Sequence, residues 1–189
     1  MMKSLVAAAL LAASAGGALA QTATFDMTPD AFKERLNRAL RADGGDPIRS
    51  CQTARNVQTC TFGDRAFQQS VAAMKEMNLL NGRFNLRTRL LIETSGGKVA
   101  GIRLTGSREE MANMMAFVSL FMNALMTMDP RITADDTKRE ADTFGLMRGD
   151  AAPDIGRERV DIRPYAAITC LNQPSRISMR VQCDLTPRS

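Results

Sequence analysis

Four cysteines constrain the fold of this chain more than any other feature, because they form two pairs that are close in sequence. Cys51 lies near Cys60, and Cys170 lies near Cys183. Each pair flanks a short segment that has the pattern of a β-hairpin. Three disulfide pairings are possible, and we favour the two local bridges because each would clamp one hairpin. Each bridge closes a small loop and should stabilise the fold by roughly 2–3 kcal/mol.

The first twenty residues indicate the compartment, and therefore how the cysteines should be interpreted. Lys3 gives a positive start, residues 5–13 are apolar, and small residues occupy positions 18 and 20. This pattern predicts a signal peptide over residues 1–20 that is removed before folding. We therefore expect a periplasmic or secreted protein, in which an even cysteine count indicates disulfides. The alternative of a zinc site is disfavoured, because the chain has no CxxC pair and no histidine.

The remaining residues, 21–189, have the length of a single domain. The full chain of 189 residues has a hydrophobic content of 44%, which is enough for a packed core. The longest uncharged stretch, residues 111–128, contains Asn113, Ser119, Asn123 and Thr127 and is too polar for a confident membrane span. We therefore expect a soluble mature protein that does not span a membrane.

Capping residues predict three helices. Thr28 and Pro29 begin a helix over 28–42, in which apolar residues share one face. Ser107 and Glu110 have the spacing of a capping box that opens a second helix, which ends near residue 128 before a proline. Residues 133–136 cap a third helix that ends near Phe144 or Gly149.

Alternating side chains predict three hairpins. The first joins residues 47–52 to 57–62, and the second joins 83–95 to 98–105 around two glycines. In the second, the even-numbered residues of 84–92 form the apolar face. The third joins residues 159–171 to 175–185, with a turn at 172–174. Residues 63–81 fit a helix or a strand, and we favour the helix.

These elements predict an α+β fold, an antiparallel sheet packed by helices and held by two intrachain disulfides. The order of elements also suggests a pseudo-repeat, with residues 21–105 and 106–189 each forming a helix-plus-hairpin unit. In this outline the chain resembles tandem helix-plus-sheet proteins such as the β-lactamase inhibitor protein. The resemblance concerns topology, and it assigns no functional residue to this chain.

An arginine row is the first candidate binding site. Arg83, Arg87 and Arg89 fall on one face of the strand predicted over 83–95. Guanidinium groups at alternate strand positions could bind phosphate or carboxylate groups of an anionic partner. The structural alternative is a solvated sheet face, where these arginines pair with acids such as Glu93.

Two further features have a possible chemistry and a simpler explanation. The helix over 107–128 contains six methionines, whose thioethers could bind Cu(I) or line an adaptable groove. Its phenylalanines and leucines favour a helix that is buried on most sides, with a narrow polar stripe. The acid pairs Glu109–Glu110 and Asp135–Asp136 could serve a glycosidase, but acids are also expected at helix starts.

The absence of histidine excludes sites that use a histidine base, including the Ser-His-Asp triad. The chain has no tryptophan and a single tyrosine, which disfavours sugar and nucleic-acid platforms. We expect no cofactor. The sequence favours an exported, non-catalytic binding protein that acts on another protein, as an inhibitor, immunity factor or envelope accessory factor. The alternatives are a binder of an anionic lipid or glycan surface and a histidine-free carboxylate hydrolase.

Overall fold

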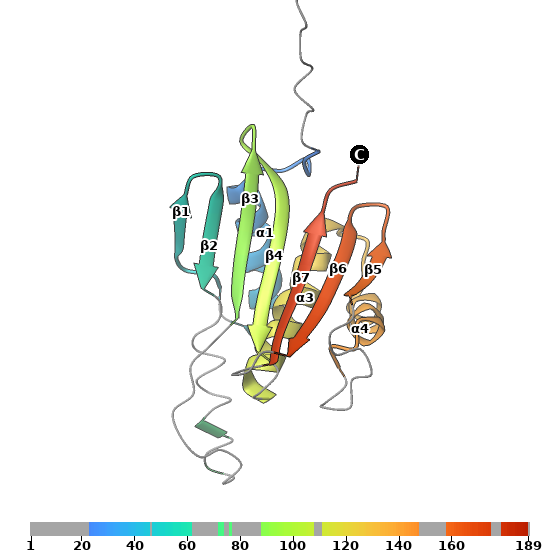
Figure 1. Ribbon diagram of the computed structural model, residues 1–189. Coiled ribbons are helices and arrows are strands. Elements are labelled where there is room, and N and C mark those ends of the chain that lie inside the picture. The colour runs from blue at the N-terminus through green and yellow to red at the C-terminus, as the bar shows by residue number, and fades with distance from the viewer. Residues whose placement is uncertain are drawn as a thin grey trace, which may run out of the picture.

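A computed structural model of the chain describes residues 23–45, 47–61, 72–73, 76, 88–107, 111–147, 158–174 and 179–188. The predicted signal peptide lies outside these residues. The described elements follow the labels of Figure 1, and their order along the chain is α1 (Pro29–Ala42), β1 (Cys51–Ala54), β2 (Val57–Thr61), β3 (Arg89–Ser95), β4 (Lys98–Ser107), α3 (Met111–Met128), α4 (Ala134–Thr143), β5 (Glu158–Ile162), β6 (Ala167–Pro174) and β7 (Met179–Thr186).

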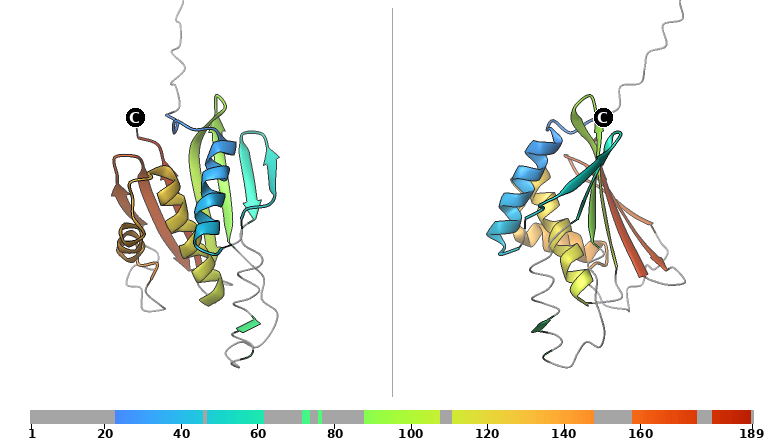
Figure 2. Two further views of the ribbon diagram at one scale, coloured as in Figure 1. Left: turned by 180° about the vertical axis from the view of Figure 1, so that it is seen from behind. Right: turned by 90° about the vertical axis from the view of Figure 1, so that its left-hand side faces the viewer.

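The strands form one antiparallel sheet, in the order β1-β2-β3-β4-β7-β6-β5. Antiparallel pairing of β4 with β7 joins the first four strands to the last three. The three helices lie on one face of this sheet, and the opposite face has no helix over it in the described part of the chain (Figure 2). The predicted α+β fold is therefore confirmed. Whether residues 21–105 and 106–189 are a true pseudo-repeat stays a prediction.

The core lies between the helices and the inner face of the sheet. Phe32, Leu36 and Leu40 of α1 are buried, as the helical spacing predicted. On β3, Leu90 and Ile92 are buried and Arg89 is exposed, which confirms the predicted face of this strand. Helix α3 packs closely on β4. A Cβ at Gly106 would lie 2.7 Å from the Cδ2 atom of Phe117, so this contact requires glycine.

Both predicted disulfides are present, Cys51–Cys60 and Cys170–Cys183. In each pair the two cysteines lie directly opposite each other on neighbouring strands, with Cα atoms 4.1 Å apart. The first bridge joins β1 to β2 at one edge of the sheet. The second joins β6 to β7, so no disulfide joins strand β5, at the other edge, to its neighbour.

The prediction for residues 159–171 was wrong. They do not form one strand: β5 ends at Ile162 and β6 begins at Ala167. Pro164 lies in the break, and a proline has no N–H with which to continue a ladder. The predicted turn at 172–174 was also wrong, because these residues belong to β6. The first hairpin is shifted too, since β1 begins at Cys51 and not at residue 47.

Most of the polar stripe of helix α3 faces the protein interior, although polar side chains on a helix usually face solvent. Asn113, Asn123 and Thr127 are buried, whereas Met115 is 57% exposed. The Nδ2 atom of Asn123 donates hydrogen bonds to the Oδ2 atom of Asp43, at 2.8 Å, and to the backbone of α3 itself. The amide therefore links α3 to the end of α1.

Two predicted features lie mostly or wholly outside the described residues. In the segment 63–81, which we favoured as a helix, the structure describes residues 72, 73 and 76, and all three are helical. The predicted capping box at Ser107 involves residues 108–110, which the structure does not describe. Ser107 itself is the last residue of β4.

Candidate functional site

A cleft with a volume of about 450 Å³ lies between helix α4, the end of α3 and the connection from β5 to β6. We call it the α4 cleft. Its wall includes Glu140 of α4 and the three residues that break the ladder, Arg163, Pro164 and Tyr165. An edge-to-face contact of Phe144 with Phe121, with ring centres 6.1 Å apart, fixes the end of α4 on α3.

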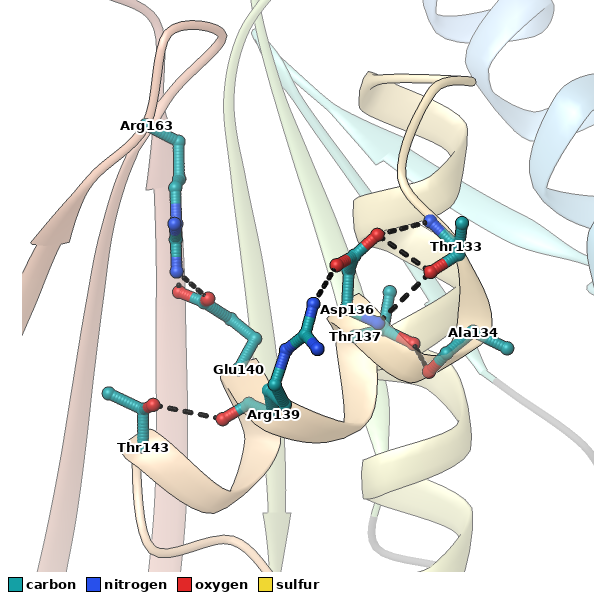
Figure 3. A network of polar contacts seen from close by, with 8 residues as sticks. All are labelled: Thr133, Ala134, Asp136, Thr137, Arg139, Glu140, Thr143 and Arg163. Carbon is teal, nitrogen blue, oxygen red and sulfur yellow. Dashed lines mark hydrogen bonds and ion pairs between the residues drawn. The ribbon is translucent and has the colours of Figure 1, made fainter.

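Helix α4 begins at a capping box formed by Thr133 and Asp136. The backbone N–H of Thr133 donates to the Oδ2 atom of Asp136 at 2.9 Å, and the N–H of Asp136 donates back to the Thr133 hydroxyl at 3.2 Å. Figure 3 shows Asp136 turned toward Thr133, with Arg139 on its other side. The Thr133 hydroxyl also donates to the Oδ2 atom of Asp136, at 2.6 Å, and this bond, followed by that of the Thr133 N–H, lowers the pKa of Asp136. The carboxylate at the mouth of the cleft is thus held ionised.

Glu140 is the buried acid of the site. Its side chain is 6% exposed, and it forms an ion pair with Arg163, which reaches it from the strand side (Figure 3). The Nη2 atom of the same guanidinium lies 2.7 Å from the Oδ2 atom of Asp161 on β5. One arginine therefore serves two carboxylates.

The pKa of Glu140 is raised to about 7, and burial is the largest cause. A hydrogen bond with Asp161 also contributes to this raised pKa, because a protonated Glu140 can donate to that carboxylate. The hydrogen bond and the charge of Arg163 act in the opposite direction and do not cancel these effects. Glu140 can therefore gain or lose a proton near neutral pH.

The rest of the wall combines a second ion pair with apolar surface. Asp129 follows α3 and accepts hydrogen bonds from the Nε and Nη2 atoms of Arg131, at 2.9 and 2.8 Å. These bonds lower the pKa of Asp129. Burial raises the pKa of Tyr165, which therefore stays a neutral phenol. Leu125, Ile132 and Pro164 supply apolar surface.

This arrangement suits binding better than glycoside hydrolysis. A glycosidase places two carboxyl groups on either side of the scissile bond, at least about 5 Å apart. Here Glu140 and Asp161 bind the same guanidinium, and a hydrogen bond between them contributes to the raised pKa of Glu140. A sugar has no room between two groups in this contact.

Of the three arginines in the predicted row, the structure describes Arg89. Arg89 is exposed on β3, on the face of the sheet away from the helices. Arg83 and Arg87 lie outside the described residues. On the same face, the Nε atom of Arg103 lies 2.6 Å from the Oδ1 atom of Asp184. Glu93 lies 4.0 Å from Arg103, so this acid pairs with a cross-strand arginine.

The other predicted sites are structural or lie outside the described residues. Glu109 and Glu110 are not described. Asp135 is exposed at the start of α4, with Lys138 at 3.8 Å, and Asp136 belongs to the capping box. Among the described residues, no group of three or more His, Cys, Asp or Glu side chains is placed to hold a metal ion, and Cu(I) binding by the methionines of α3 stays a prediction. In the same part of the chain, no helix has the length and apolar character to span a membrane.

Sequence reasoning missed the Glu140–Arg163 pair, although one signal was present. Thr137, Ala141 and Phe144 share the buried face of α4, and Glu140 lies on that face beside them. An acid among the buried positions of an amphipathic helix needs a partner. The partner follows 23 residues later, and helical spacing could not identify it.

No protein-family model, curated protein or solved structure matches this chain. Its function is therefore argued from the geometry of its own residues.

Proposed function

We propose that this chain is an exported, non-catalytic binding protein that acts on another protein, and that the partner adds a strand at the β5 edge of the sheet. Extended segments commonly bind to an exposed sheet edge through main-chain hydrogen bonds, and side-chain pockets beside the edge give specificity. Strand β5 and the α4 cleft supply such an edge and such a pocket, and Asp161 connects them.

The exposure of β5 carries this proposal. Among the described strands, β5 pairs with β6 alone. Val160 is 60% exposed and Ile162 is 62% exposed, and they are two of the four large hydrophobic residues that are exposed in the described part of the chain. Three of the five residues of β5 are charged, which is a common protection of an edge strand, but its two apolar residues stay exposed, and exposed apolar residues at an edge invite pairing. A partner strand would cover the edge-facing side of both side chains.

The charge of this edge favours a different protein over a second copy of the chain. Arg163 is shared between Glu140 and Asp161, so this cluster of three described residues has a surplus carboxylate. Two copies joined edge to edge would bring two such surpluses together. A partner strand with a basic residue facing the inner side of the sheet would compensate the charge.

Photo-cross-linking tests the proposal. A photoreactive amino acid is placed at Val160, and at Glu34 on the exposed side of α1 as a control, and each variant is irradiated in an envelope extract. We expect one specific adduct from position 160 and none of it from position 34. The protein in that adduct is then purified, and its affinity is measured for the wild type, Val160→Lys and Gln52→Lys.

Val160 and Gln52 occupy the two opposite edges of the sheet, so the two lysine variants are matched. We expect Val160→Lys to weaken binding about tenfold or more, as for a central interface residue, and Gln52→Lys to leave it unchanged. Equal effects of the two variants, or the absence of a specific adduct at position 160, would overturn the proposal. A cross-linked dimer of the chain itself would assign the edge to a second copy instead.

A further inference from the structure

Among the described residues in and around the α4 cleft, carboxylates outnumber guanidinium groups by one. Asp129 pairs with Arg131, and Asp136 pairs with Arg139. Arg163 is then left with both Glu140 and Asp161. The Glu140 carboxyl is the most buried of these groups and shares its guanidinium with Asp161, so its charge is only partly compensated, and burying such a charge is costly.

We propose that the α4 cleft binds a guanidinium or ammonium group on a short alkyl chain, which pairs with Glu140 and displaces its proton. The inference rests on the proposed function, because the expected carrier of this group is an arginine or lysine side chain of the partner protein. When the cation binds, Arg163 keeps Asp161 and the ligand takes Glu140. Each carboxylate then has its own cation, and the Glu140 proton passes to solvent.

The walls of the cleft fit this class of ligand. Leu125, Ile132 and Pro164 can contact the alkyl chain. Tyr165 also lines the cleft, and a neutral aromatic ring attracts a cation that lies over its face. A volume of about 450 Å³ falls within the range typical of small-ligand pockets. An anionic ligand would instead meet the surplus carboxylate.

The displaced proton makes the binding dependent on pH. The charged and titratable groups around Glu140 are Asp161 on β5, Arg163 and Tyr165 after it, Asp129 and Arg131 beyond α3, and Asp136 and Arg139 on α4 itself. With the pKa of Glu140 at about 7, roughly one molecule in eleven is ionised there at pH 6, and roughly ten in eleven at pH 8. Binding to the ionised form should therefore be about tenfold tighter at pH 8.

Two small probes and one neutral control test this inference on the purified chain. Butylguanidine and butylammonium are titrated at pH 6 and pH 8 by calorimetry, with butanol as the uncharged control. The ¹³C signal of the Glu140 carboxyl is followed in parallel at pH 6.5. We expect both cations to bind, about tenfold more tightly at pH 8, and to move the carboxyl signal to its ionised position. Butanol should do neither.

The variants Glu140→Gln and Asp135→Asn complete the test. Glu140→Gln should abolish binding of both cations, whereas Asp135→Asn removes an exposed carboxylate from the same helix and should leave binding unchanged. Binding that persists in Glu140→Gln, or that does not depend on pH, would overturn the inference. If the probes fail to bind while the partner still binds at β5, this inference fails and the proposed function stands.

Guanidinium and ammonium probes also distinguish the two basic side chains. A clear preference for butylguanidine points to arginine in the partner strand, and a preference for butylammonium points to lysine. Replacing the matching residue in the purified partner should then weaken its binding to the wild type and have no further effect on Glu140→Gln. If the partner variant and Glu140→Gln instead weaken binding additively when they are combined, the partner's side chain does not contact Glu140, and the inference is contradicted.

Discussion

The two edges of the sheet end in different ways. Strand β1 is four residues long, exposes Gln52, Thr53 and Ala54, and is bound covalently to β2 through Cys51–Cys60. Strand β5 exposes Val160 and Ile162, and no disulfide joins it to β6. It is linked instead to helix α4 through the carboxylates around Arg163. The β1 edge is clamped by a disulfide, and the β5 edge combines two exposed apolar residues with charged ones and is held by ion pairs.

We expect the β1 edge to serve stability and the β5 edge to serve function. A clamped polar edge discourages further pairing, so the β1 end terminates the sheet. An apolar edge beside a cleft that contains a protonatable acid costs stability in the isolated chain, and such a cost is typical of functional sites. We therefore expect changes at the β5 end to depend on pH and on a partner, and changes at the β1 end to depend on neither.

The largest effect should come from removing the cation that holds the β5 end. Arg163→Met leaves Glu140 and Asp161 close together without their shared guanidinium. We expect the free energy of unfolding to fall by about 3–5 kcal/mol at pH 8, and by less at pH 5, where Glu140 is protonated. Denaturant unfolding at the two pH values measures this. Arg89→Met, at an exposed position, is the control and should cost less than about 0.5 kcal/mol. Equal losses of unfolding free energy in Arg163→Met and Arg89→Met would show that the ion pairs of Arg163 do not stabilise the fold.

The pH dependence of stability should be the next largest effect. The pKa of Glu140 is raised in the folded chain to about 7 from 4.5, so the folded state binds more protons between these values. Stability therefore falls as the pH rises through this window, by up to about 3 kcal/mol. The lowered pKa values of Asp129 and Asp136 act below about pH 4 and do not affect this interval.

The variant Glu140→Gln tests whether Glu140 causes this pH dependence of stability. Relative to the wild type, it should lose most of the decrease in unfolding free energy between pH 5 and pH 8, whereas Asp135→Asn should retain it. Unfolding by urea at several pH values provides the measurement. A wild-type stability that does not change across this interval would mean that Glu140 is ionised throughout.

The disulfide at the β1 edge should contribute somewhat less. Replacing Cys51 and Cys60 together with serine reopens a loop with a sequence separation of nine residues, and we expect a loss of about 2–3 kcal/mol at pH 5 and pH 8 alike. Amide exchange should become faster in β1 and β2 and stay unchanged in β5. Faster exchange in β5 would show that the two edges are not independent.

The arginine row should have the smallest effect on stability. Arg89 is exposed, and the sequence predicts the same for Arg83 and Arg87. Replacing all three with Gln should therefore change the free energy of unfolding by less than about 1 kcal/mol, because exposed charges contribute little. Sedimentation with anionic vesicles at low and high salt tests the alternative function. Salt-sensitive binding that the triple variant loses would favour the anionic-surface alternative over the β5 edge.

Local patterns explain how much of the fold the sequence could predict. Thr28 and Pro29 mark the start of α1, alternation places Leu90 and Ile92 inside, and the cysteines identify two hairpins. Each of these signals acts over a few residues. The pairing of β4 with β7 joins residues about 80 positions apart and leaves no local pattern. Pro164 did mark the break between β5 and β6, and the alternation on either side of it concealed that signal.

The candidate site could be predicted far less well. Its central pair, Glu140 and Arg163, joins a helix to the connection between two later strands, and Asp161 enters through the register of β5. None of these spacings is periodic. The arginine row was predicted because alternation within one strand is a local property, whereas a cleft is built from elements whose relative positions only the fold determines.

Amide hydrogen exchange in the presence of the purified partner tests the central claim most directly, that the β5 edge is the binding edge. The account predicts that residues 158–162 exchange more slowly when the partner is bound, while residues 51–54 at the clamped edge exchange at the same rate as in the free chain. Slower exchange at 51–54, with no change at 158–162, would contradict it.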